Sequence, residues 1–172
     1  MASVSLANSQ ASLRKTAFQF LVLMGIVSLC ADVTYQGARG IHGPFFLSLG
    51  ASATAVGAVA GLGETIGYVM RLLSGYASDR SRRYWTIAFV GYAVNLLAVP
   101  LLALAQTWQM AAGLILAERI GKATRVPARD AMLSHATKHT GHGIGFGLHK
   151  ALDQIGAMGG PLLIWAVLSS NP

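Results

Sequence analysis

The sequence is poor in charged residues and has almost no cysteine. Charged residues make up 11% of the 172 residues, whereas they make up about 25% of an ordinary soluble domain. The single cysteine, Cys30, excludes a disulfide within the chain. There is no Gly-Lys-Ser/Thr phosphate loop, which argues against an ATP-driven pump, and no nucleophile in a recognisable catalytic motif. We therefore expect a protein that is not an enzyme and needs no cofactor.

Long apolar runs dominate what the sequence does contain. Hydrophobic residues make up 53% of the chain, and a bilayer crossing takes about 20 mostly apolar residues. The predicted membrane-spanning helices are about 17–49, 53–73, 84–105, 108–128 and 144–168, after an N-terminal tail of residues 1–16. The expected fold class is therefore an all-α membrane protein with five spanning helices in a lipid bilayer.

The basic residues mostly flank the apolar runs. The net charge is +7, but a nucleic-acid-binding protein gathers its basic residues on a soluble surface, so we expect no nucleic-acid partner. Arg14 and Lys15 precede the first run, a pattern also typical of a signal peptide. Four further runs favour the first as one spanning helix of a set. By the positive-inside rule, the basic residues that flank the apolar runs predict a cytoplasmic N-terminus in a multi-pass protein of the cytoplasmic (plasma) membrane.

The charged stretch SGYASDRSRRYW lies between the second and third runs. Four of its residues follow a known order: Gly75, Asp79, Arg80 and Arg83. In this order and position the chain resembles the major facilitator superfamily, whose loop between helices two and three carries such a motif. Arg82 stands where that family has a second glycine. The resemblance implies a transporter. Because the loop is cytoplasmic and far from mid-membrane, we predict that Asp79 and Arg80 serve as a conformational latch rather than a substrate site; a plain orientation anchor is the alternative.

The fifth run carries a second match, formed by Gly147, Gly156, Gly160 and Pro161. Their spacing resembles the fifth-helix motif of the family's antiporters, although that motif's further glycine pair is absent. Gly156 and Gly160 share a helix face and would let a neighbouring backbone approach closely, while Pro161 can kink the helix. Generic packing of small residues remains the alternative interpretation.

The resemblance also implies how much of a transporter is present. Family members usually have twelve helices in two six-helix halves, so five helices would be a truncated N-terminal bundle whose partner is the missing C-terminal half. The implied activity of the complete protein is proton-coupled efflux of a small amphipathic molecule. Uptake of a small solute and a non-transporting membrane scaffold are the alternatives.

Charged residues at membrane depth are the best candidates for proton coupling or for lining the substrate cavity. A charge at the bilayer centre costs about 2.5–3.5 kcal/mol or more, so it should face protein or water. The candidates are Asp32, Glu64, Glu118, Arg119 and Asp153. Arg119 fits the place of a functional arginine in the family's fourth helix. We favour Asp32, beside Arg119, as the proton carrier, with Glu64 and Asp153 in reserve; a structural ion pair is the alternative for each.

Two further groups of polar residues are not expected to take part in proton coupling or substrate binding. The stripe of Lys122, Arg125 and Arg129 is expected to anchor the fourth helix at the cytoplasmic surface, where it could interact with Asp79 or Asp130. Three histidines cluster between the fourth and fifth runs: His135, His139 and His142. Since no cysteine or carboxylate is arranged to complete a ligand set, we expect no metal site.

Overall fold

The computed structural model describes the backbone of residues 2–170 and the side chains of residues 10–138 and 140–170. Five helices follow one another along the chain: α1 (Ala2–Ser48), α2 (Ala53–Ser81), α3 (Tyr84–Leu102), α4 (Trp108–Thr140) and α5 (His142–Ser170). No strand occurs within these residues. The predicted all-α fold with five helices is confirmed.

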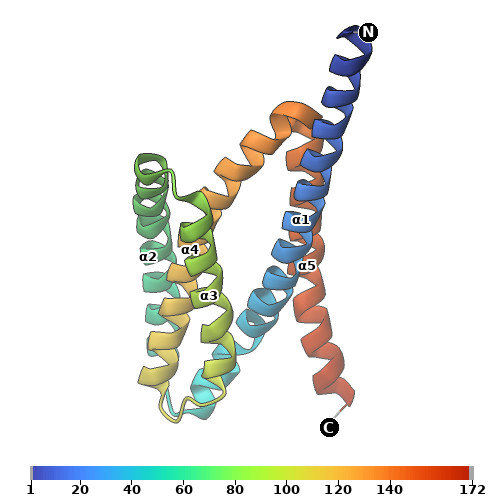
Figure 1. Ribbon diagram of the computed structural model, residues 1–172. Coiled ribbons are helices and arrows are strands. Elements are labelled where there is room, and N and C mark those ends of the chain that lie inside the picture. Colours follow the sequence, from blue (N-terminus) through green and yellow to red (C-terminus); the bar gives the residue numbers. More distant parts are fainter. Residues whose placement is uncertain (1, 171–172) are drawn as a thin grey trace.

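The helices pack as two groups joined by α4 (Figure 1). Helices α1 and α5 lie side by side, and α2 and α3 lie against α4. Helix α4 contacts all four other helices, and it crosses from the α2–α3 group towards the start of α5. Side chains from every other helix can therefore meet the polar residues of α4.

Helix α4 differs from the others in composition. Four helices are long and apolar enough to cross a membrane, namely α1 from Gln10, α2, α3 and α5. Helix α4 is interrupted by charged side chains, yet most of these are inside the protein, with Glu118 only 1% exposed and Arg125 fully buried. An apolar shell thus surrounds a polar helix, which is how charge is accommodated at membrane depth.

Two helices extend well beyond their predicted ends. Helix α2 continues to Ser81, so Gly75, Asp79 and Arg80 lie in its last turns and not in a loop. The connection to α3 is only residues 82–83, and Arg83 is the residue before α3 begins. Helix α2 ends because Arg82 adopts a left-handed conformation (φ 54°), from which its backbone N–H donates to the Ser78 carbonyl. The turn for which the family uses glycine is therefore made here by an arginine.

Helix α4 likewise continues to Thr140, through residues predicted to be a loop. The break before α5 is made by Gly141, whose φ of 94° suits a glycine. His135 therefore lies in a helix, and the His142 ring hydrogen-bonds to the Thr137 hydroxyl at 2.8 Å. The side chain of His139 lies outside the described residues. Among those that are described, no group of three or more potential ligands could hold a metal.

The remaining helix ends differ less from prediction. Helix α1 begins at Ala2, so the expected tail is helical from that residue onwards, while Met1 lies outside the described residues. It runs through Pro44 to Ser48. Helix α3 ends at Leu102 rather than at 105, and α5 runs to Ser170 rather than to 168.

Glycines bring two pairs of helix backbones into contact. A Cβ at Gly156 would lie 2.6 Å from the Leu29 carbonyl oxygen, and one at Gly160 would lie 2.5 Å from the Val33 carbonyl oxygen. Helices α1 and α5 therefore touch backbone to backbone at both glycines. Gly147 takes no part in this contact, because a Cβ there would meet nothing within 4 Å.

Helices α3 and α4 approach each other in the same way. A Cβ at Gly91 would lie 2.6 Å from the Arg125 backbone nitrogen, and one at Gly121 would lie 2.5 Å from the Asn95 backbone nitrogen. This contact holds the charged part of α4 directly against α3.

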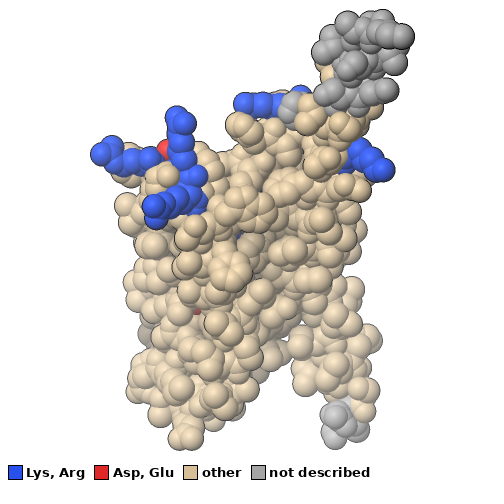
Figure 2. All heavy atoms as spheres, viewed as in Figure 1, with Lys and Arg blue, Asp and Glu red and all other residues tan. Residues whose placement is uncertain are grey.

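Most of the exposed basic residues gather at one end of the molecule. Figure 2 shows Lys and Arg near the connection between α2 and α3, near the start of α1 and near the junction of α4 and α5, while the rest of the face in this view shows almost no charge. This end is called the basic end below. Its charge asymmetry is the property on which the predicted orientation depends.

Candidate functional site

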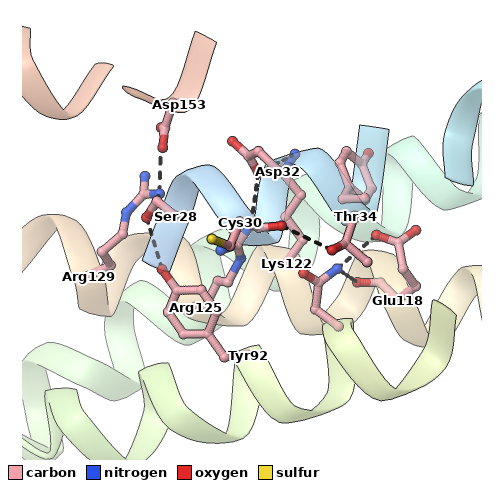
Figure 3. Close-up of polar contacts among 12 residues, drawn as sticks. Ser28, Cys30, Asp32, Thr34, Tyr92, Glu118, Lys122, Arg125, Arg129 and Asp153 are labelled. Carbon is pink, nitrogen blue, oxygen red and sulfur yellow. Dashed lines mark hydrogen bonds and ion pairs between the residues drawn. The ribbon is translucent and has the colours of Figure 1, made fainter. Parts of the chain in front are cut away.

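A stripe of polar side chains on α4 forms the centre of the candidate site. Glu118, Lys122, Arg125 and Arg129 recur at intervals of three or four residues, so they lie along one side of the helix. Arg119 lies beside this stripe. Figure 3 shows Arg125 and Arg129 pointing from α4 towards α1, with Asp32 and Ser28 facing them. Lys122, Arg125 and Arg129 are therefore parts of an interior network; the expectation that they serve as surface anchors is wrong.

Asp32 of α1 is held by two cations from α4. Its Oδ1 lies 3.0 Å from Nη2 of Arg125 and 3.7 Å from Nζ of Lys122. The Arg125 guanidinium also lies over the ring of Tyr92, with 4.4 Å from its carbon to the ring centroid. The expected proximity of Arg119 to Asp32 is not found, because Arg119 pairs elsewhere. One carboxylate oxygen of Asp32 thus contacts two cations, which makes Asp32 an ion-pair partner between α1 and α4.

Glu64 of α2 is the second paired carboxylate. Its Oε1 accepts from Nη2 of Arg39 at 2.8 Å and also accepts from Arg119. Arg39 in turn donates to the Tyr35 hydroxyl at 3.1 Å. Glu64 thus joins α1, α2 and α4 through a carboxylate flanked by two guanidinium groups.

Asp153 of α5 is the third carboxylate that is paired with a basic side chain. Its Oδ2 lies 3.6 Å from Nη1 of Arg129, and its Oδ1 lies 3.5 Å from Nε2 of His149. Arg129 also pairs with Asp130 at 3.0 Å and donates to the Ser28 hydroxyl at 3.2 Å. Arg129 is therefore the residue that connects α1, α4 and α5.

Glu118 is different from these three carboxyl groups. It is buried to 1% exposure, and its Oε1 accepts a hydrogen bond of 2.9 Å from the Asn95 amide. Its other oxygen, Oε2, has no hydrogen-bond partner in the described structure. No described cation lies within 4.0 Å of the carboxyl group. Glu118 is therefore the one charged candidate among the carboxyl groups that has an amide and no basic side chain as its partner in the described structure.

Two polar cavities open beside the stripe. The small polar cavity, about 140 Å³, is lined among others by Tyr35, Arg39, Glu64 and Arg119. The large polar cavity, about 400 Å³, is lined among others by Asp32, Arg125, Arg129, Lys150 and Asp153. Arg71 and Lys122 line both. The structure thus brings Asp32, Glu64, Arg119 and Asp153 to the walls of the two cavities, and places Glu118 behind them.

The residues of the predicted latch lie apart from these cavities, near the basic end. Asp79 is exposed, with its Oδ1 3.5 Å from the Tyr84 hydroxyl, and it forms no ion pair with any described basic residue. A Cβ at Gly75 would lie 3.6 Å from Pro127, so this glycine faces α4. Arg80 and Arg83 are exposed.

Several site residues were not foreseen from the sequence. Arg39 lies seven residues after Asp32, a spacing that puts both on one face of α1 and was available as a signal. Asn95 is the most buried polar residue of α3, but an asparagine in an apolar run does not reveal its partner. Arg71 lies seven residues after Glu64, a spacing that puts both on one face of α2.

Comparison with known proteins adds the following. A family model described as Major Facilitator Superfamily matches residues 16–171. An uncharacterized protein of Mycobacterium tuberculosis (strain H37Rv) is 49% identical over 154 residues, which cover 90% of this chain and 38% of that protein. An uncharacterized MFS-type transporter of Methanocaldococcus jannaschii is 33% identical over 141 residues, or 82% of this chain and 35% of that protein. The chain thus spans little more than a third of the length of these relatives. No solved structure matches it significantly.

Proposed function

The chain belongs to the major facilitator superfamily, and from that membership we propose that its helices are part of a transporter that exports a small amphipathic molecule in exchange for protons. The family and the apolar helices make it a multi-pass membrane protein. Because the chain covers 38% of its mycobacterial relative, the activity is proposed for a complete transporter. In it, a C-terminal half would close the cavities from the other side.

The observation that carries the proposal is the contrast between Glu118 and the other interior carboxyl groups. Asp32, Glu64 and Asp153 each lie within 4.0 Å of at least one basic side chain, whereas Glu118 has only the Asn95 amide. A proton carrier has to accept and release a proton, and a carboxylate that is already held by basic side chains would have to give up those contacts to do so. We therefore assign the proton to Glu118 instead of Asp32.

Loss of the proton from Glu118 would also alter the contact between α1 and α4. Lys122 lies one turn further along α4, within reach of Glu118 by the spacing of four residues. Its ammonium group is 3.7 Å from Asp32, a longer contact than that of Arg125. A carboxylate at Glu118 would draw Lys122 away from Asp32. Protonation would thereby be linked to the packing of α1 on α4, which is what coupling to a conformational change requires.

The direction of transport is supported by the packing of α5. Gly156 and Gly160 place α5 directly on the backbone of α1, in the part of the helix whose spacing resembles the antiporter motif. In the predicted orientation, with the basic end and the N-terminus in the cytoplasm of a plasma membrane, the large polar cavity, which Arg129 and Lys150 line, would lie towards the cytoplasmic side.

The test is substrate-evoked proton movement in proteoliposomes that contain the full-length transporter and a pH-sensitive dye. A panel of amphipathic compounds is added on one side, and the wild type is compared with Glu118→Gln and with Glu64→Gln as a matched carboxyl-to-amide control. We expect Glu118→Gln to lose proton release and keep substrate binding, and Glu64→Gln to keep the stoichiometry of exchange. Full proton release from Glu118→Gln would refute the assignment of the carrier.

A further inference from the structure

The large polar cavity contains more positive charge than its own carboxylates neutralise. Five of its lining residues are basic: Arg71, Lys122, Arg125, Arg129 and Lys150. Three are acidic: Asp32, Asp130 and Asp153. Counting these residues gives five positive against three negative charges, with His149 as the remaining titratable group.

All three carboxylates are already engaged by α4. Asp32 pairs with Arg125 and Lys122, and Arg129 pairs with both Asp130 and Asp153. The two cations left over are Arg71 and Lys150, neither of which lies within 4.0 Å of a carboxylate in the described structure. The guanidinium carbon of Arg71 lies 5.9 Å from the ring centroid of Tyr68, which orients it but does not neutralise it.

The positions of these two cations suit a ligand placed between helices. Arg71 belongs to α2 and Lys150 to α5, and both side chains are exposed along the wall of one cavity. Arg71 lies ten residues before the end of α2 and Lys150 eight residues after the start of α5. At 1.5 Å per residue, the two are about 15 Å and 12 Å from the helix ends that lie at the basic end. Both cations therefore lie well inside their helices, where an uncompensated charge that faces lipid is costly.

We propose that the molecule transported by this protein carries an anionic group, a carboxylate or a phosphate, that binds in the large polar cavity between Arg71 and Lys150. Such a group satisfies both cations and brings the charge of the cavity closer to balance. This inference rests on the transport function proposed above and specifies its substrate as an amphipathic anion. The headgroup of an anionic lipid offers the same chemistry, so the experiment has to separate the two sources.

The experiment measures binding of two xanthene dyes to the full-length protein in nanodiscs by fluorescence anisotropy. Carboxyfluorescein is the anionic probe and rhodamine 123 the cationic one, and the nanodiscs contain phosphatidylcholine alone. We expect carboxyfluorescein to bind more tightly than rhodamine 123. The double variant Arg71→Gln/Lys150→Gln should weaken carboxyfluorescein binding by about tenfold or more, which corresponds to the loss of a charge-assisted hydrogen bond.

Two further variants separate charge from folding. The double variant Arg71→Lys/Lys150→Arg keeps both charges and should bind carboxyfluorescein within about threefold of the wild type, because the point charges that attract the anion remain. Lys138→Gln removes an exposed basic residue that lines neither polar cavity, and it should leave binding unchanged.

The outcomes against the proposal are equally specific. Tighter binding of rhodamine 123, no binding of carboxyfluorescein, or an equal loss in the Lys138→Gln control would overturn it. Complete competition by phosphatidylglycerol added to the nanodiscs would assign the two cations to a lipid headgroup and overturn the substrate assignment. A protein that binds carboxyfluorescein through Arg71 and Lys150 but never exchanges it for protons would support the anion site and refute the exchange mechanism instead.

Discussion

Replacing Arg82 by glycine should stabilise the protein. Arg82 ends α2 with φ 54° and ψ 16°, the left-handed conformation that glycine adopts without steric conflict. For a residue with a Cβ, this conformation costs about 1–2 kcal/mol. Glycine also adds about 0.4–1 kcal/mol of conformational entropy to the unfolded chain, which opposes the gain. Because Arg82 makes no ion pair in the described structure, the net stabilisation should be about 0.5–1 kcal/mol.

Thermal unfolding in detergent measures this effect. A stabilisation of 1 kcal/mol raises Tm by about 2–4 °C for a chain of this size, so we expect a rise of about 1–4 °C for Arg82→Gly. The matched control is Arg82→Ala, which removes the same side chain beyond Cβ and keeps the strained backbone. A rise of equal size in Arg82→Ala would show that the arginine side chain, and not its φ angle, was the source of the strain. A fall in Tm for Arg82→Gly would refute the reasoning altogether.

Three other perturbations test the packing and the network. Asp32→Asn leaves Arg125, which is fully buried, with one charged partner fewer, and should lower the free energy of unfolding by about 3–5 kcal/mol in denaturant titrations, as when one partner of a buried pair is removed. Gly156→Val places side-chain atoms where a Cβ alone would lie 2.6 Å from the α1 backbone, so it should abolish monodisperse protein on size-exclusion chromatography, whereas Gly147→Val should not. Asp79→Asn should slow transport in proteoliposomes and leave substrate affinity unchanged if Asp79 serves the latch; an equal loss of affinity would contradict that role.

Four of the five helices followed from the sequence because each contains a long apolar run. Their ends were harder to predict, since the stretch around Asp79 is as polar as a loop yet continues as helix until Arg82 adopts its left-handed conformation. In the same way, α4 continues through Arg129 because that residue finds buried partners on two other helices. A polar segment whose partners are distant in sequence cannot be distinguished from a solvated one by composition.

For the candidate site, too, the sequence predicted which residues belong to it but not which residues pair with one another. All five charged candidates lie in or next to one interior network, as their cost at membrane depth suggested. The sequence could also place Glu118 and Arg119 about 100° apart on α4. It could not tell which neighbouring helix each would face, so Arg119 was paired with Asp32, whereas the structure pairs it with Glu64. The choice of the proton carrier depends on which basic residue pairs with each carboxylate, so it could not be made from the sequence.

The burial of the polar helix α4 has a consequence for how the protein is made. Each charge that α4 would expose to lipid costs about 2.5–3.5 kcal/mol or more, and α4 alone lacks an apolar segment sufficient to compensate. The amide of Asn95 and the glycine contacts at Gly91 and Gly121 offer α4 a partner in the helix synthesised just before it. Helices α3 and α4 should therefore leave the translocon as one hairpin, with the charges covered before they reach the bilayer. On this view, the order of synthesis is part of what allows so polar a helix to be inserted.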